Sequence, residues 1–175
     1  MMRRDLNRRA LGLLLMTLLS LASLPTLALE GDANAPIEIV ADRLELDDQA
    51  GTAVYTGDVD MRQGSMQLTG QKVTISRTDE GEVSRIEATG DRAYIEQQPS
   101  PEASLAKGWG RTIIYHVQDR WVELIGQAEL HRGQDTFTGA RVDYYLDRRV
   151  VEANSGADGG DEQSQRVRMT LTPQQ

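Results

Sequence analysis

The chain has 175 residues, with 19 lysines and arginines against 27 aspartates and glutamates, so its formal net charge at pH 7 is −8. This excess of negative charge argues against nucleic acid as a ligand, because nucleic-acid binding requires a basic surface, and it disfavours anionic membrane surfaces. The sequence contains no cysteine, which excludes a thiolate nucleophile, an iron–sulfur cluster and a cysteine zinc site.

The first residues have the three-part layout of a secretory signal peptide. Four arginines within residues 3–9 precede an apolar run of 15 residues from Ala10 to Leu24, and a small-residue cleavage site ends at Ala28. The run is shorter than the roughly 20 residues that a membrane-spanning helix requires. We therefore expect export to remove residues 1–28 and residues 29–175 to form one domain, with 15 basic and 26 acidic side chains left.

From residue 37 onward, apolar side chains recur at every second position, as in β-strands with one buried face. The alternation runs through residues 37–39, 44–46, 53–61, 66–68 and 73–75. Short segments rich in Gly, Asp and Gln separate these runs and favour hairpin turns. No segment after residue 30 keeps a helical period for three turns, so the sequence predicts an all-β domain.

The β-pattern contains an internal repeat. Residues 56–75 align without a gap with residues 125–144, and a weaker third copy begins near Gly90, so the unit spans roughly 33 to 36 residues. Such a repeat indicates stacked β-layers that bury their apolar faces together. We expect the repeated glycines to form bends, bulges or corners with positive φ. The identical pairs include Gly57 and Gly126, Gly64 and Gly133, Gly70 and Gly139, and Val73 and Val142.

Two segments interrupt the alternation, residues 97–107 and 154–165, and both are rich in Pro, Gly, Ser and acidic residues. We expect them to be flexible surface loops. The first and last strands are expected at residues 37–41 and 166–172, where unpaired backbone groups would form open sheet edges. Pairing of two different edges need not close, so it predicts head-to-tail association. The expected edge residues are Ile37, Ile39, Val167, Met169 and Leu171.

The sequence offers no catalytic residues and no metal or cofactor site. His116 and His131 lie 15 residues apart on expected strands without a metal-ligand spacing, and no G-x-S-x-G motif is present. Carboxylates alternate with apolar residues, which places them on the solvated strand face. These carboxylates are Glu38, Glu45, Asp58, Asp60, Glu123 and Glu129.

Four segments carry a resemblance to a known family: Gly-Asp-x-x-x-Pro-Ile-Glu-Ile at 31–39, Tyr-Thr-Gly-Asp-Val at 55–59, Tyr115, and Leu-Ile-Gly-Gln-Ala at 124–128. The chain resembles the OstA family of periplasmic lipopolysaccharide-transport proteins over nearly all of residues 29–173. A longer and more acidic segment at 156–163 departs from the family pattern.

The resemblance implies an open-ended, twisted β-jellyroll of about sixteen antiparallel strands, with an apolar interior that receives the acyl chains of lipid A. It also implies a place in a periplasmic bridge built from head-to-tail oligomers. An inner-membrane partner of similar fold would meet the N-terminal end, and the outer-membrane lipopolysaccharide translocon would meet the C-terminal end.

If the stack is open, its inward face forms a continuous apolar trough instead of a closed core. We expect lipid to contact inward-facing residues, and phosphate contacts to come from basic residues such as Arg43, Lys72, Arg92 or Lys107. The expected lipid contacts are Ile37, Ile39, Tyr55, Val59, Met61, Met66, Leu68, Ile95, Ile113, Tyr115, Leu124, Leu130, Phe137 and Tyr144.

Three functional classes and one purely structural alternative remain open. A lipopolysaccharide-binding bridge component, which is favoured, should form chains, whereas a general lipid shuttle should stay monomeric. An enzyme acting on envelope polysaccharide would need convergent carboxylates in a cleft. A purely structural β-stack would have a closed, well-packed interior and no lipid affinity.

Overall fold

The computed structural model describes residues 35–100, 103–156 and 166–172. The expected signal peptide at 1–28 lies outside this part of the chain, as do residues 101–102 and 157–165 of the two expected loops. The described residues form one antiparallel sheet of ten strands, and they include no helix long and apolar enough to cross a membrane. The strands are β1 (Glu38–Val40), β2 (Arg43–Asp47), β3 (Thr52–Gln63), β4 (Met66–Arg77), β5 (Val83–Gln97), β6 (Ala106–His116), β7 (Trp121–Arg132), β8 (Asp135–Tyr145), β9 (Val150–Asn154) and β10 (Arg168–Thr170).

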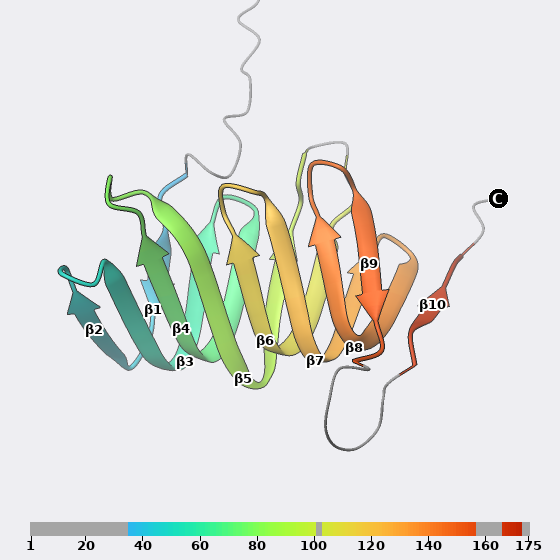
Figure 1. Cartoon of the computed structure of the whole chain (residues 1–175), viewed down its shortest axis with the longest axis horizontal. Helices are drawn as coiled ribbons and strands as arrows, with labels where there is room; N and C mark the ends of the chain where they lie inside the picture. The colour runs from blue at the N-terminus through green and yellow to red at the C-terminus, as the bar shows by residue number, and fades with distance from the viewer. Residues whose placement is uncertain (1–34, 101–102, 157–165, 173–175) are drawn as a thin grey trace, which may run out of the picture.

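The strands lie side by side nearly in chain order, with β1 and β2 at one end and β9 and β10 at the other (Figure 1). The pairing register shifts near the middle of each pair from β3–β4 to β7–β8, where the strands bend. Strand β8 changes its outer partner at the same level, from β10 to β9. Each of the six long strands therefore contributes to two walls.

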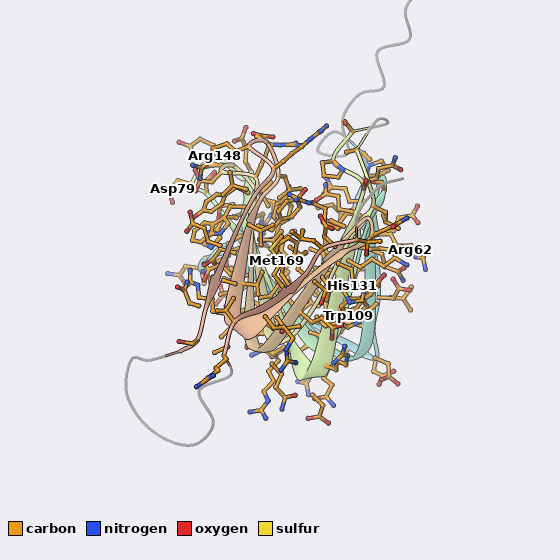
Figure 2. The ribbon with its side chains drawn as sticks, turned by 90° about the vertical axis from the view of Figure 1, so that its right-hand side faces the viewer. Arg62, Asp79, Trp109, His131, Arg148 and Met169 are labelled. Atoms are coloured by element: carbon orange, nitrogen blue, oxygen red, sulfur yellow. The ribbon has the colours of Figure 1, made fainter. Side chains whose placement is uncertain are left out.

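We call these the first wall and the second wall, and Figure 2 shows them from one end, with Arg62 and His131 on the first and Asp79 and Arg148 on the second. The first wall comprises β1, residues 59–63, 66–70, 93–97, 106–110, 128–132 and 135–139, and β10. The second wall comprises β2, residues 52–56, 72–77, 83–89, 112–116, 121–125 and 141–145, and β9.

The bends also explain the strand count. About sixteen strands were expected, and the described residues form ten, because hydrogen bonding continues past each bend. Six bent strands give twelve half-strands, and the four short strands bring the total to sixteen. The prediction of an all-β, open-ended antiparallel fold is confirmed.

The repeated glycines produce the bends. Gly57 and Gly126 have φ values of +83° and +75°, a conformation that residues with a Cβ rarely adopt, and each lies at a register shift. Gly139 is needed for a different reason, since a Cβ there would lie 2.8 Å from the carbonyl oxygen of Asn154 on β9. The sequence prediction that these glycines form bulges and corners is confirmed.

The hydrophobic core lies between the two walls. Residues of one strand parity point inward from both walls, and those in the middle strands are almost fully buried. Small inward residues gather next to the bend, where Ala93 is opposite Gly110 and Ala128 is opposite Gly139. Because these residues are small, the two walls converge closely at the bend and diverge towards the hairpin tips.

Candidate functional site

All fourteen predicted lipid contacts lie on the inner surface between the walls. Eleven belong to the buried core, and Ile37, Ile39 and Tyr55 pack against it as partly buried residues. The alternation in the sequence thus identified one common face correctly. Contact of these residues with lipid stays a prediction.

Sequence reasoning left out other residues of the same inner surface, most of them on the second wall or near the bend. They follow the same alternation, so the strand periodicity was the signal that could have found them. The omitted buried residues are Val73, Ile75, Ile86, Ala88, Ala93, Ala106, Val122, Ala128, Val142 and Leu146.

The middle of the interior is closed, whereas the sequence predicted a continuous open trough. Met61, Leu68, Ile113 and Leu124 have no exposed surface, and an apolar void of about 20 Å³ beside Leu124 is far too small for an acyl chain. The physical reason is that the walls converge at the bend, and side chains from both then fill the space at the density of a protein core. A bound chain would require the walls to separate.

The inner surface is uncovered at both ends. At the N-terminal end, Leu44 and Leu46 on β2 lie opposite Tyr55 and Ala53, on the inner side, and remain 54% and 55% exposed. At the C-terminal end, Met169 on β10 lies opposite Phe137 and is 49% exposed. The apolar inner rows therefore continue to the two ends of the stack, where nothing in the described chain covers them.

The same two ends present free strand edges. Among the described strands, β1 and β2 pair only with β3, and β9 and β10 pair only with β8. Of the predicted edge residues, Ile37 and Ile39 are partly buried at β1, whereas Val167 and Leu171 flank β10 and are exposed. Such edges present unpaired N–H and C=O groups to an incoming strand.

The outer face of the second wall holds a layered polar cluster. Nε2 of His116 lies 2.6 Å from Oε1 of Glu123, and Arg141 approaches the other carboxylate oxygen at 3.0 Å. The rings of His116, Trp121 and Tyr145 stack in a row across β6, β7 and β8. Glu123 lies on the outer face, as the alternation predicted, but the expected solvation is wrong: this cluster shields the side chain, and only 7% of Glu123 is exposed.

The outer face of the first wall carries a second aromatic cluster around Trp109. The Trp109 ring contacts the rings of Tyr94 and His131, and Glu129 pairs with both Arg92 and His131 at 2.8 and 2.7 Å. The hydrogen bond from Arg92 is the main cause that holds the pKa of the Glu129 carboxyl below its ordinary value, and the hydrogen bond with His131 adds to it. Burial opposes both effects. These side chains neutralise one another.

The two histidines lie on different walls, and each is engaged with its own glutamate. Within residues 35–100, 103–156 and 166–172, no group of three His, Asp or Glu side chains is placed to hold a metal ion.

Comparison with known proteins gives one consistent match. A family profile described as "LptA/(LptD N-terminal domain) LPS transport protein" matches residues 38–150. The lipopolysaccharide export system protein LptH of Pseudomonas aeruginosa is 39% identical over 155 residues, which cover 89% of this chain and 88% of LptH. LptA of Escherichia coli K12 is 28% identical over 176 residues, covering 99% and 91%.

A crystal structure of Pseudomonas aeruginosa LptH, described as the periplasmic component of a lipopolysaccharide transport device, has a similar fold. It superposes with a TM-score of 0.74 and 36% sequence identity, covering 82% of this chain and 99% of the LptH chain. The likeness therefore extends over most of the chain.

Proposed function

Because the chain belongs to the family of LptA and LptD N-terminal-domain lipopolysaccharide-transport proteins, we propose that it is a non-catalytic, lipopolysaccharide-binding component of a periplasmic bridge. The acyl chains of lipid A lie between the two walls, and the bridge carries lipopolysaccharide from the inner to the outer membrane. The lipopolysaccharide export function of LptH and LptA and the expected signal peptide support this assignment.

The observation that carries the proposal is the uncovered inner surface at both ends. Leu44 and Leu46 at one end and Met169 at the other expose apolar side chains that continue the inner rows. When the C-terminal end of one unit meets the N-terminal end of the next, these side chains become neighbours. The inner surfaces of successive units then join, as a lipid bridge requires.

The free energy of lipid burial is large enough for binding. Each buried CH₂ group contributes about 0.8 kcal/mol, so a dozen groups contribute on the order of 10 kcal/mol. Association costs about 4–15 kcal/mol in lost freedom. The acyl chains also replace the contacts that the walls lose on separating, and the flexible side chains of Met61 and Met66, both in the core, adapt to a new neighbour.

The two ends differ in sequence and therefore select different partners. The edge formed by β1 and β2 meets an inner-membrane partner of similar fold, and the edge formed by β9 and β10 meets the outer-membrane lipopolysaccharide translocon. Pairing between copies of this chain uses the same two edges and gives an open head-to-tail oligomer.

A general lipid shuttle is the second candidate, and the closed middle of the interior favours it. A monomer that opens only for its ligand would protect acyl chains from water without any partner. Oligomeric state separates the two functions, because a shuttle stays monomeric at every concentration and a bridge component does not.

Photo-crosslinking tests the site. A photoreactive residue at Ile37 or Tyr115 should capture lipopolysaccharide, whereas one at Glu38 or Glu45, on the outer side of the N-terminal end, should not. Equal capture at the inner and outer positions would contradict binding between the walls.

Size-exclusion chromatography at rising protein concentration, with and without lipopolysaccharide, tests the bridge. Wild-type protein should form oligomers, and removal of residues 166–175 or the substitution Met169→Pro should shift it towards monomer, because β10 then loses its ladder hydrogen bonds. A wild-type protein that remains monomeric, together with captured lipid, would favour the shuttle.

A further inference from the structure

A polar pocket opens between the tips of the two walls near the C-terminal end. It has a volume of about 780 Å³ and is lined by residues of β7, β8, the turn after β8 and the segment after β10. Arg132 reaches it from the first wall and Arg149 from the second, while Ser104 and Thr172 contribute hydroxyl groups. The predicted lipid contacts did not include this region, except for Tyr144.

Two guanidinium groups converge on this pocket. Arg132 lies over the Phe137 ring at 5.7 Å, and its Nη1 donates a hydrogen bond of 2.7 Å to the carbonyl oxygen of Arg149. Neither arginine forms an ion pair with a carboxylate in the described part of the chain. Asp135 also lines the pocket, but its Oδ1 accepts from the backbone N–H of Thr172. Two guanidinium groups against this one carboxylate leave the pocket with a net positive charge in an acidic protein.

The positively charged pocket adjoins the apolar interior through Tyr144. Tyr144 lines both this pocket and the small apolar void beside Leu124. Burial raises the pKa of the Tyr144 hydroxyl, while the charges of Arg132 and Arg149 oppose this rise, so both charges act at the inner surface. A ligand with a phosphorylated headgroup and acyl chains matches this arrangement, in which a positively charged pocket lies next to an apolar interior.

We propose that Arg132 and Arg149 bind the phosphate monoester headgroup of an acylated lipid whose chains lie between the walls. The inference rests on the proposed function and assigns a headgroup site to it. Guanidinium groups suit this ligand, because they donate paired hydrogen bonds to phosphate oxygens and always carry their charge.

The four basic residues singled out from the sequence are not part of this pocket. Arg43 and Lys72 are exposed on the second wall, and Arg92 pairs with Glu129 on the outer face. Lys107 lies between the buried residues 106 and 108 and therefore points outward. Arg132 and Arg149 could not be paired from the sequence because they are 17 residues apart and come together only through the reach of the Arg132 side chain from one wall to the other.

A lipid-competition assay tests the site with two probes that share their acyl chains, lipid A with its phosphates and enzymatically dephosphorylated lipid A. Wild-type protein should bind the phosphorylated form about tenfold more tightly, as expected for charge-assisted hydrogen bonds. Arg149→Gln, which keeps the carbonyl group that accepts from Arg132, should lose most of this preference, and Arg132→Gln with Arg149→Gln should lose all of it.

The matched control is Arg148→Gln, which removes the same charge from the adjacent residue. Arg148 stacks at 4.1 Å on the ring of Tyr145, which lies on the outer face, and it is located at the tip of the second wall (Figure 2). The preference for phosphorylated lipid A should therefore stay at the wild-type value. Binding of dephosphorylated lipid A by every variant shows that the fold is intact. Inorganic phosphate alone should compete with neither lipid.

Five outcomes would overturn the assignment. The double variant could keep the wild-type preference, Arg148→Gln could lose as much as Arg149→Gln, or inorganic phosphate could displace the lipid as well as lipid A does. Wild-type protein that binds both lipids equally would also refute the headgroup site but leave the proposed function intact. Wild-type protein that binds neither lipid would refute both.

Discussion

The same Leu→Ala substitution, made once in the core between the walls and once at the uncovered end, distinguishes the stability of the monomer from association between units. Leu68 on β4 lies between Met61 and Ile95 in the register of the sheet and has no exposed surface. Leu46 on β2 belongs to the same inner face but lies at the uncovered end and is 55% exposed. Leu68→Ala should destabilise the monomer, whereas Leu46→Ala should mainly weaken association.

The magnitudes follow from burial. A fully buried Leu→Ala substitution costs about 2–5 kcal/mol, because transfer energy is lost and a cavity remains. For a domain of this size, about 3 kcal/mol lowers Tm by roughly 10 °C. Leu46 is already half exposed, so Leu46→Ala should cost the monomer under about 1 kcal/mol. Burial of its exposed half between two units is worth about 1 kcal/mol, or about fivefold in the association constant.

Thermal unfolding followed by circular dichroism at low protein concentration measures the first effect, and sedimentation velocity over a concentration series measures the second. Leu68→Ala should retain association in proportion to its folded fraction. The reasoning fails if Leu46→Ala lowers Tm as much as Leu68→Ala does, or if Leu46→Ala associates as tightly as the wild type.

Three further outcomes are expected. Gly139→Ala should destabilise the domain by about 1–3 kcal/mol in urea unfolding, because its Cβ would lie 2.8 Å from the Asn154 carbonyl oxygen, which is held in the β8–β9 pairing; an unchanged urea midpoint would contradict this. The folded pKa of Glu129 is below its ordinary 4.5, so its stabilisation is present above that pH and is lost as pH falls through the folded pKa. When the pH falls from neutral to below the folded pKa, the free energy of unfolding of Glu129→Gln should therefore decrease less than that of the wild type. Parallel plots of unfolding free energy against pH for the two proteins would refute the role of Arg92. Chelator should leave both Tm and lipid capture unchanged, whereas loss of capture together with a stoichiometric bound metal would show that a metal site exists.

Much of the fold could be predicted because local pattern and global structure agree. Period-two alternation identified the inner face, and the repeated glycines, such as Gly57 and Gly126, marked the positions of the bends. These features depend on backbone geometry within a few residues. Their physical cause is therefore visible in a single sequence.

The remaining features depend on distances between segments, which periodicity does not contain. The closed middle of the interior follows from how steeply the walls converge. Glu123 has the alternation of a solvated residue, yet His116 and Arg141 from neighbouring strands cover it. Likewise, Arg132 and Arg149 come together only because the Arg132 side chain reaches from a hairpin tip of the first wall to one of the second.

The contrast between a closed middle and uncovered ends bears on how lipid would move through a bridge. In the middle, a passing acyl chain replaces apolar contacts between the walls with apolar contacts of its own. At a junction of the proposed bridge, it would leave one exposed apolar row for another, from Met169 of one unit to Leu44 and Leu46 of the next. Because the acyl-contacting rows are apolar throughout, transfer of the acyl chains between units would be close to neutral in free energy. The direction of flow would therefore be imposed by supply at one end and removal at the other, without a gradient of acyl-chain affinity along the inner surface.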